Sequence, residues 1–196
     1  MDPGDASVSE MKVSPGTFLV AGPELLDPNF MHAVVLICQH SDEGAFGFII
    51  NRPIEYSTQE AFPDHPLLGK VDLPIYQGGP VQVDSLQFLH RVPEALPNSI
   101  ELTKDLHWGG DAEALAKFLE RDPSSAQSDL RLLIGYSGWG GGQLDAELAE
   151  GVWLPSPSTS GAVFDEDLKT LWRRVVDSIG PQAEGFSDQP PDPSWN

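Results

Sequence analysis

Cysteine and long apolar runs are scarce in this chain of 196 residues. The single cysteine, Cys38, excludes an intrachain disulfide and any metal site built from several thiolates. It stands within an apolar run, which is typical of a small buried hydrophobic residue. No stretch approaches the roughly 18 to 20 apolar residues that a membrane-spanning helix needs, and the N-terminus lacks the pattern of a signal peptide. We therefore expect a cytoplasmic protein without a membrane partner.

Basic side chains are also few. Lys and Arg total 11 against 30 Asp and Glu, which gives a formal net charge of −19. A field of that sign repels phosphate backbones, which a nucleic-acid-binding protein must neutralise. The adjacent Arg173 and Arg174 flank an apolar helical stripe and do not form a basic recognition helix. Direct nucleic-acid binding is therefore disfavoured, and a transcriptional regulator that contacts DNA is kept as the second alternative function.

Histidine pairs with metal-ligand spacing are missing. The chain has five histidines, but no two stand at helical ligand spacing and no His-Glu-x-x-His motif occurs. We expect neither a metal ion nor a cofactor. His90, beside Arg91 at the end of an alternating strand, remains a candidate functional side chain, with a structural role as its alternative.

Glycine, in contrast, is concentrated in one segment, residues 135–142. A buried strand leads into it, and a short helix follows from about Gln143. Because glycine permits backbone conformations and close approaches that other residues cannot adopt, the segment predicts a tightly specified turn. Two aromatic side chains, Tyr136 and Trp139, lie within this turn. We expect Trp139 to face solvent as a contact residue, whereas Trp153 and Trp172 are expected in the core.

The glycine-rich segment also resembles two known motifs imperfectly. Residues 135–139 read Gly-Tyr-Ser-Gly-Trp, so the last glycine of a nucleophile elbow is replaced by Trp139. Residues 138–143 lack the third glycine of a dinucleotide fingerprint. Anion binding by free N–H groups at the helix start is a further possibility, opposed by the acidic residues of that helix. We interpret Ser137 as a residue whose hydroxyl satisfies a backbone group of the turn.

Arg52 is conspicuous because it is one of few basic residues in the first half of the chain. A basic side chain at the end of a central hairpin usually pairs with a carboxylate. Sometimes such a side chain anchors an anionic ligand. The enzymatic alternative is a hydrolase or transferase of unknown substrate that uses Ser137, His90 and Arg52. It requires the serine and the imidazole to approach hydrogen-bond distance, about 2.6 to 3.2 Å.

The remaining pattern predicts a single α+β domain over residues 15–180, which suits the length of the chain. Residues 33–39 and 45–51 form a predicted hairpin that is apolar on both faces and therefore belongs in the middle of a sheet. Apolar stripes predict helices over residues 111–121 and 165–179.

The two ends of the chain contribute little apolar area. Residues 1–14 are polar, and residues 181–196 are acidic and rich in proline. Because such segments bury too little to offset their ordering entropy, we expect the first to be mobile and the second to be disordered.

Six ordered blocks stand out against this background: Gly16–Ala21, Asp27 with Phe30, Gly44–Pro53, Gly78–Val81, Leu89–His90 and Gly135–Leu154. Together they resemble the bacterial YqgE/AlgH family. The resemblance implies a bent mixed sheet, partly closed like a small barrel and surrounded by helices. It implies no established activity, cofactor or catalytic residue, although one family name refers to transcriptional regulation.

The favoured function is a non-enzymatic binding or regulatory module that contacts a protein or a small ligand. Its candidate binding surface comprises Arg52, Gly78, Gly79, Pro80, His90, Tyr136, Ser137, Trp139 and Gln143.

Overall fold

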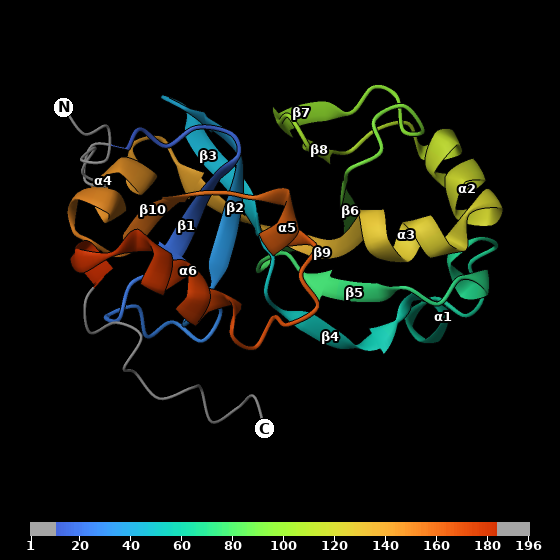
Figure 1. Cartoon of the computed structure of the whole chain (residues 1–196), viewed down its shortest axis with the longest axis horizontal. Helices are drawn as coiled ribbons and strands as arrows, with labels where there is room; N and C mark the ends of the chain where they lie inside the picture. Colours follow the sequence, from blue (N-terminus) through green and yellow to red (C-terminus); the bar gives the residue numbers. More distant parts are fainter. Residues whose placement is uncertain (1–10, 184–196) are drawn as a thin grey trace.

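The computed structural model describes residues 11–183, which form ten strands and several short helices (Figure 1). The strands are β1 (Thr17–Ala21), β2 (Val34–Ser41), β3 (Gly44–Ile49), β4 (Pro53–Ser57), β5 (Pro74–Gln77), β6 (Val81–His90), β7 (Ile100–Thr103), β8 (Leu106–Trp108), β9 (Leu130–Gly140) and β10 (Trp153–Pro157). The helices are α1 (Thr58–Ala61), η2 (Leu68–Lys70), α2 (Ala112–Arg121), α3 (Pro123–Asp129), α4 (Gln143–Ala149), α5 (Ser160–Val163), α6 (Leu171–Ile179) and η3 (Pro181–Ala183).

All ten strands belong to one bent mixed sheet. Its path runs β10-β1-β2-β3-β9-β6-β8-β7, with β5 paired to β9 and β4 paired to β5. Only the pairing of β5 with β9 is parallel among the described strands. The predicted α+β class is confirmed. The path ends at β10 and at β7, which do not pair with each other, so the predicted partial closure into a barrel is wrong.

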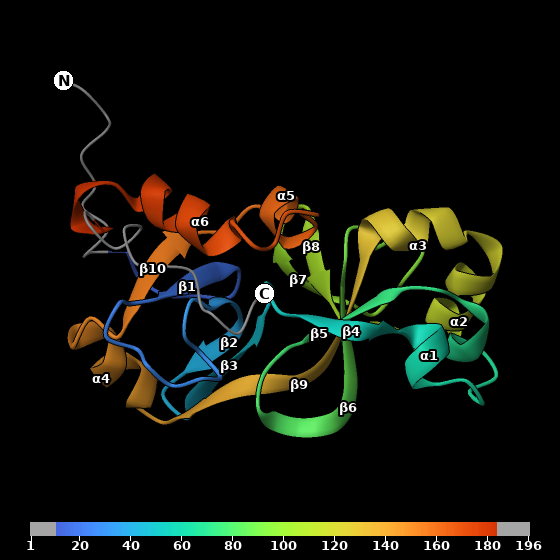
Figure 2. The ribbon, with the colours of Figure 1, turned by 90° about the horizontal axis from the view of Figure 1, so that it is seen from below.

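Strand β9 joins two halves of the sheet. Its first residues pair with β5 and β6, and its last residues pair with β3 (Figure 2). We call the strands β10, β1, β2 and β3 the β1–β3 half, and the strands β4 to β8 the β6–β8 half. Because β9 continues through both, the two halves are parts of one domain.

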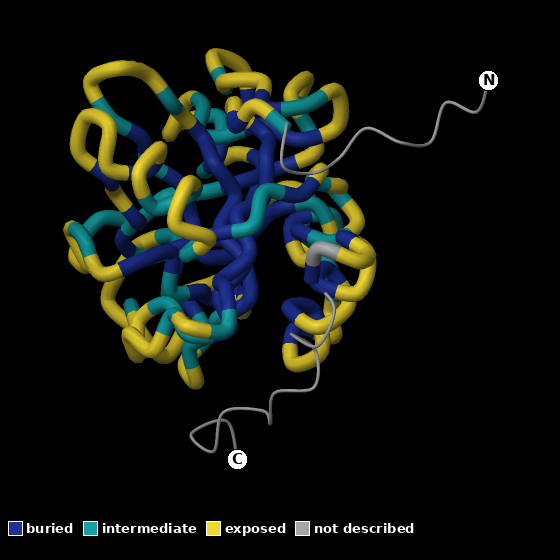
Figure 3. The backbone as a smooth tube through the Cα atoms, turned by 90° about the vertical axis from the view of Figure 1, so that its left-hand side faces the viewer, coloured by how far each residue is buried: buried dark blue, intermediate teal, exposed yellow. Residues whose placement is uncertain are grey.

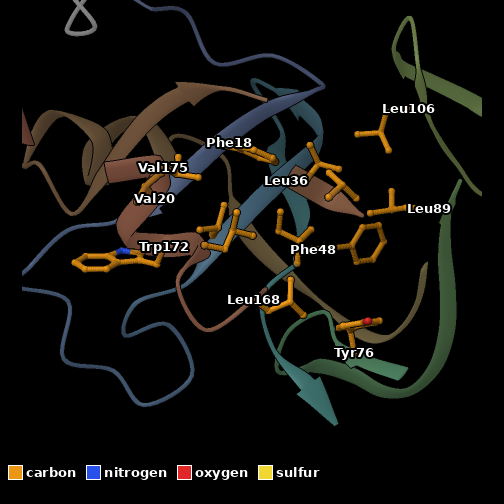
Figure 4. Packing of buried hydrophobic residues seen from close by; sticks show 14 of the residues in the cluster. Phe18, Val20, Leu36, Phe48, Tyr76, Leu89, Leu106, Leu168, Trp172 and Val175 are labelled. Carbon is orange, nitrogen blue, oxygen red and sulfur yellow. The ribbon is translucent and has the colours of Figure 1, made fainter. Parts of the chain in front are cut away.

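The β1–β3 half is buried on both faces, as its apolar strands predict. Side chains of successive strand residues point to opposite faces. Phe18 and Val20 accordingly belong to one core cluster, and Leu19 and Ala21 belong to another. Helix α6 packs on the first face, and α4 packs on the second (Figures 1 and 4). The predicted central hairpin is confirmed, because β2 lies between β1 and β3 and both of its faces are covered.

Both clusters are extensive, and the first continues into the β6–β8 half. The first contains the residues labelled in Figure 4, among them Leu36, Phe48, Leu89, Leu168 and Trp172. Figure 3 shows the same arrangement along the backbone, with buried strands at the centre and exposed loops around them. Cys38 is buried in this cluster, as predicted, and burial raises the pKa of its thiol.

The β6–β8 half is covered on one side by α2 and α3, which pack on a third cluster. Asp111 caps α2 by accepting a hydrogen bond from the Ala114 N–H at 2.8 Å, so the predicted start of this helix is confirmed. Asp122 then ends α2 and caps α3, which directly follows it in the chain. The sequence prediction missed α3, and it also missed β4 and β8.

A crossing of two glycine-containing segments fixes the point where the halves meet. Residues 78–79 lie against residues 135–136 so closely that a Cβ atom on Gly79 would stand 2.2 Å from the carbonyl carbon of Tyr136. A Cβ atom on Gly135 would stand 2.4 Å from the Gly79 carbonyl oxygen. Both glycines also have positive φ, at 154° and 70°. Only glycine fits either position without displacing backbone.

Two predicted boundaries are wrong for reasons that are visible in the structure. Strand β9 continues through the glycine-rich segment as far as Gly140, because Gly44 to Gly47 of β3 pair with it. The predicted turn is thus confined to the residues just before α4. The last helix begins at Leu171 and not at Asp165, since Asp165 and Asp167 accept hydrogen bonds from local backbone N–H groups.

The predictions that residues 1–14 are mobile and that residues 181–196 are disordered concern mainly the two ends of the chain. Residues 1–10 and 184–196 lie outside the described residues. Of the segment predicted to be mobile, Val13 packs in the cluster that also holds Trp139. Of the segment predicted to be disordered, residues 181–183 form η3, in which Ala183 is buried.

Replacing Gly79 by alanine should lower the free energy of unfolding by about 2 to 5 kcal/mol. This range combines about 1 to 2 kcal/mol for the left-handed backbone with about 1 to 3 kcal/mol for overpacking. Gly109→Ala is the matched control, because Gly109 also has positive φ, at 71°, but a Cβ atom there meets nothing within 4 Å. Urea unfolding of both variants measures the difference. Equal losses for the two would contradict the close crossing.

Candidate functional site

A pocket of about 620 Å³ opens where the two halves of the sheet face each other. Its walls come from β2, β3 and β9 on one side and from β6 and β8 on the other. We call it the aromatic pocket. It is lined by Gln39, Ser41, Glu43, Gly44, Ala45, Phe46, Phe48, Val81, Gln82, Gln87, Trp108, Tyr136, Gly138 and Trp139.

Four rings form one wall of this pocket. Phe46 is their common neighbour, with centroid distances of 4.9 Å to Trp108, 6.0 Å to Tyr136 and 6.0 Å to Phe48. Its ring is inclined to theirs by 68°, 76° and 81°, so it is stacked face to face with none of them. Phe46, Trp108 and Tyr136 are half-buried, whereas Phe48 is fully buried behind them. Edge-to-face packing fixes the rings and leaves part of their surface to the pocket.

Polar groups surround the aromatic wall. Three glutamine side chains line the pocket, from Gln39, Gln82 and Gln87. The Trp108 indole N–H donates to the Gln87 Oε1 at 3.2 Å, which orients that ring and that amide together. The only carboxylate among the described lining residues belongs to Glu43, which is exposed in the turn between β2 and β3. Such a combination of apolar surface and a few polar groups is typical of small-molecule sites.

Part of the predicted binding surface lies beside the pocket, where the segments that contain Gly79 and Gly135 cross. Tyr136 lines the pocket, and it follows Gly135, which crosses Gly79. Gly78 and Gly79 are buried beneath this point, and the exposed Pro80 leads into the pocket residue Val81. This part of the prediction therefore lies in one place.

Trp139 does not face solvent, so that expectation is wrong. The residue is only 7% exposed; it lines the pocket, and its side chain belongs to the cluster under α4. Its indole meets the Trp153 ring at 5.8 Å, and both indole N–H groups donate to the Glu147 Oε2 at 2.8 Å. The Gln143 amide donates to the other oxygen of Glu147 at 2.8 Å. The Gln143 Oε1 in turn accepts a hydrogen bond from the Gly140 N–H at 3.1 Å, so Trp139 and Gln143 both fasten α4 to β9.

His90 is a buried residue at the far end of β6. Its Nδ1 accepts a hydrogen bond from the Val92 N–H at 3.2 Å, so its Nε2–H donates to the Gly109 carbonyl at 3.0 Å. The ring stacks on that of His107 at 5.5 Å. The pKa of His90 is lowered to about 4, chiefly by burial; the hydrogen bond to the Gly109 carbonyl opposes this shift, and the neighbouring His107 adds to it. The imidazole is therefore neutral and holds the β6–β8 end of the fold.

Ser137 lies far from His90. The register pairs His90 with Leu130 of β9, and Ser137 stands seven residues further along that strand. At about 3.3 Å per residue, the separation is roughly 23 Å. The Ser137 hydroxyl is fully buried and donates to the Gly78 carbonyl at 3.2 Å, as its structural interpretation predicted. The serine and the imidazole therefore cannot act as a nucleophile and its base.

Arg52 lies in the loop that joins β3 to β4. Its guanidinium donates to the carbonyls of Pro28 and Met31, at 3.1 Å and 2.6 Å. These contacts hold the turn that precedes β2. Arg52 is therefore placed with that turn and not among the residues that line the aromatic pocket.

Within residues 11–183, no group of three or more His, Cys, Asp or Glu side chains is arranged to hold a metal ion. No helix of the described part of the chain is long and apolar enough to cross a membrane.

The comparison with protein families identifies the chain. A family model described as AlgH-like matches residues 18–184. This chain belongs to the AlgH-like family. It is 38% identical over 184 residues to a UPF0301 protein of Chlorobaculum tepidum, which covers 94% of this chain and 96% of that one. It is 37% identical over 181 residues to a UPF0301 protein of Vibrio vulnificus, which covers 88% and 95%. The resemblance that the sequence blocks suggested is thus confirmed.

Solved structures show the same architecture. The AlgH-like chain is similar to the AlgH protein of Pseudomonas aeruginosa, with a TM-score of 0.59 and 28% identity over 84% of this chain and 85% of that one. It also shares its fold with protein DIP2367 of Corynebacterium diphtheriae, with a TM-score of 0.71 and 23% identity over 90% and 93%. The names of these proteins specify no reaction or ligand.

Sequence reasoning about the AlgH-like chain missed most of the aromatic pocket. Phe46 was placed in an apolar strand, and Trp108 and Gln87 received no role. The sequence carried no signal for the role of Phe46, because the apolar run around it predicts burial on both faces of the strand. The positions of Trp108 and Gln87 depend on the pairing of β6 with β8, which the local pattern does not encode.

Removing the Glu147 carboxylate should destabilise the packing of α4 on β9 and β10. Glu147→Ala leaves two indole N–H donors without their acceptor, which should lower the free energy of unfolding by about 1 to 3 kcal/mol. Glu150→Ala, at an exposed position after the same helix, should change it by less than about 0.5 kcal/mol. Guanidinium unfolding followed by tryptophan fluorescence measures both. A neutral Glu147→Ala would show that the indole contacts add no stability.

The low pKa of His90 predicts a dependence of stability on pH. The unfolded chain protonates His90 near its ordinary pKa, whereas the folded chain does so only near 4. Stability from the neutral ring is complete above about pH 6.5 and is lost as the pH falls toward 4. Between pH 7 and pH 5, the wild type should lose up to about 2 kcal/mol more than His90→Gln. If the free energies of unfolding of the two proteins changed in parallel with pH, the lowered pKa of His90 in the folded chain would be contradicted.

Proposed function

We propose that this AlgH-like protein is a non-enzymatic binding or regulatory module of the cytoplasm, and that it holds a small ligand in the aromatic pocket. Of the predicted surface residues, Tyr136 contacts the ligand in this proposal. Gly78, Gly79 and Pro80 support the adjoining wall. Trp139 also lines the pocket, and together with Arg52, His90, Ser137 and Gln143 it maintains the fold around it.

One observation carries this proposal. The pocket combines half-buried aromatic rings with glutamine amides, and it has the size of a site for a small organic molecule, about 300 to 1,000 Å³. The described lining residues include no histidine, cysteine or lysine that could activate a nucleophile. A site with recognition groups and without a catalytic set favours binding over chemistry.

The two alternatives have weaker support. The hydrolase or transferase needs Ser137 and His90 in contact, but both side chains are committed to backbone partners at opposite ends of β9. Direct DNA binding needs a positive surface, which a net charge of −19 opposes. Regulation in this proposal therefore runs through the bound ligand.

Blocking the pocket tests the proposal. Gly138 is an exposed pocket residue of β9, and a Cβ atom there would lie 3.2 Å from the Tyr136 ring, so Gly138→Leu fills the space above that ring. Ligand-observed NMR of the full chain with a mixed library of cationic, neutral and anionic fragments gives the readout. We expect fragments that bind the wild type to lose at least about tenfold in affinity in Gly138→Leu.

Gly140→Leu is the matched control. Gly140 is also exposed in β9, two residues further along, but it does not line the pocket, and a Cβ atom there approaches only the Gln143 side chain, at 3.9 Å. Its fragment binding should equal that of the wild type. A library without binders, or binders that ignore Gly138→Leu, would overturn the proposal.

A further inference from the structure

We infer that the aromatic pocket selects a small organic cation, specifically a compound that carries a quaternary ammonium group. This inference rests on the proposed function, because it names the class of ligand for the same pocket. Three independent features of the pocket lead to it: the arrangement of its rings, the sign of its charge and its supply of hydrogen-bond acceptors.

The rings present the geometry that a cation requires. Trp108 and Tyr136 are both inclined steeply to Phe46, by 68° and 76°, at 4.9 Å and 6.0 Å. Phe48 closes the group from behind, at 6.0 Å from Phe46 and 6.2 Å from Trp108. Each edge-to-face contact covers one face of one ring, and the half-buried Phe46, Trp108 and Tyr136 keep part of their surface open to the pocket. A cation within about 6 Å of such faces is attracted by their quadrupoles, and tryptophan is the strongest partner.

The charge of the pocket has the matching sign. Glu43 is its only carboxylate, and no lysine, arginine or histidine is found among the described lining residues. The net charge of −19 adds a long-range field that attracts cations and repels phosphates and carboxylates. The Glu43 carboxylate and the negative net charge both disfavour a nucleotide or an organic acid. Neither of them favours a neutral sugar over a cation.

The number of N–H donors on a cation, compared with the acceptors in the pocket, favours one class of cation. A guanidinium carries five N–H donors and a primary ammonium carries three, and each needs an acceptor when it leaves water. The Gln87 oxygen already accepts from the Trp108 indole, and the Ser41 hydroxyl is directed to the Gly44 carbonyl. The other amide and carboxylate acceptors of the pocket belong to Gln39, Gln82 and Glu43, which are exposed. A quaternary ammonium has no N–H donor to satisfy, so it loses least when it lies against the half-buried rings and apart from these exposed acceptors.

Choline and its neutral carbon isostere, 3,3-dimethylbutan-1-ol, provide the direct test. The two have the same shape and hydroxyl and differ in the positive charge. We titrate each into the full-length protein and follow the Trp108 indole N–H resonance by NMR. Choline should bind about 5- to 30-fold more tightly than the isostere, as desolvated cation–π contact and charge predict. Added salt should weaken choline binding and leave the isostere unchanged.

Three variants assign the selectivity to named groups. Phe46→Leu keeps apolar bulk but removes one ring, so it should weaken choline binding at least about threefold and leave the isostere unchanged. Glu43→Gln, at an exposed position in the turn between β2 and β3, should weaken choline binding about two- to fivefold. Glu120→Gln removes the same charge from the exposed face of α2, away from the pocket, and should have no effect.

The outcomes separate this inference from the proposed function. Equal binding of choline and the isostere, or equal losses from Glu43→Gln and Glu120→Gln, would overturn the cation selectivity while the pocket remains a binding site. Failure of choline, when other fragments bind and respond to Gly138→Leu, would do the same. Failure of every fragment would overturn both.

Discussion

The close crossing of Gly78–Gly79 with Gly135–Tyr136 is the constraint on which the rest of the structure depends. The Gly78 carbonyl accepts hydrogen bonds from the Ile49 N–H at 2.8 Å and from the Ser137 hydroxyl at 3.2 Å, and the Gly78 N–H donates to the Ile134 carbonyl at 2.8 Å. These bonds join β3, β9 and the segment between β5 and β6 at one point. The sheet bends there because two backbones occupy space that side chains would otherwise fill.

The aromatic pocket follows from that bend. Helices pack on both halves, and the half-buried rings of Phe46, Trp108 and Tyr136 line the pocket between the halves. The rings of the pocket pack against the first core cluster, so residues that stabilise the fold also hold these rings in place. A site built in this way is organised before a ligand arrives, which reduces the cost of binding.

The sequence predicted what local patterns encode. The central hairpin, the cap at Asp111 and the burial of Cys38 follow from apolar runs and short-range chemistry, and the family resemblance follows from ordered blocks. The exposure of Trp139 was predicted wrongly, because glycines on both sides suggested a loop, whereas pairing with β3 extends the strand and places the ring under α4. Phe46 and Trp108 meet only through β9 and β6, and such long-range pairings cannot be read from local periodicity.

Native-state hydrogen exchange at the Gly78 and Ile49 amides tests most directly whether the crossing holds the two halves together. If it does, both amides exchange only through global unfolding, with the same free energy of opening as the most protected amides of β2. Exchange of either amide through a local opening several kcal/mol below that value would show that the halves separate in the folded protein, and would contradict the crossing as the constraint that shapes the pocket.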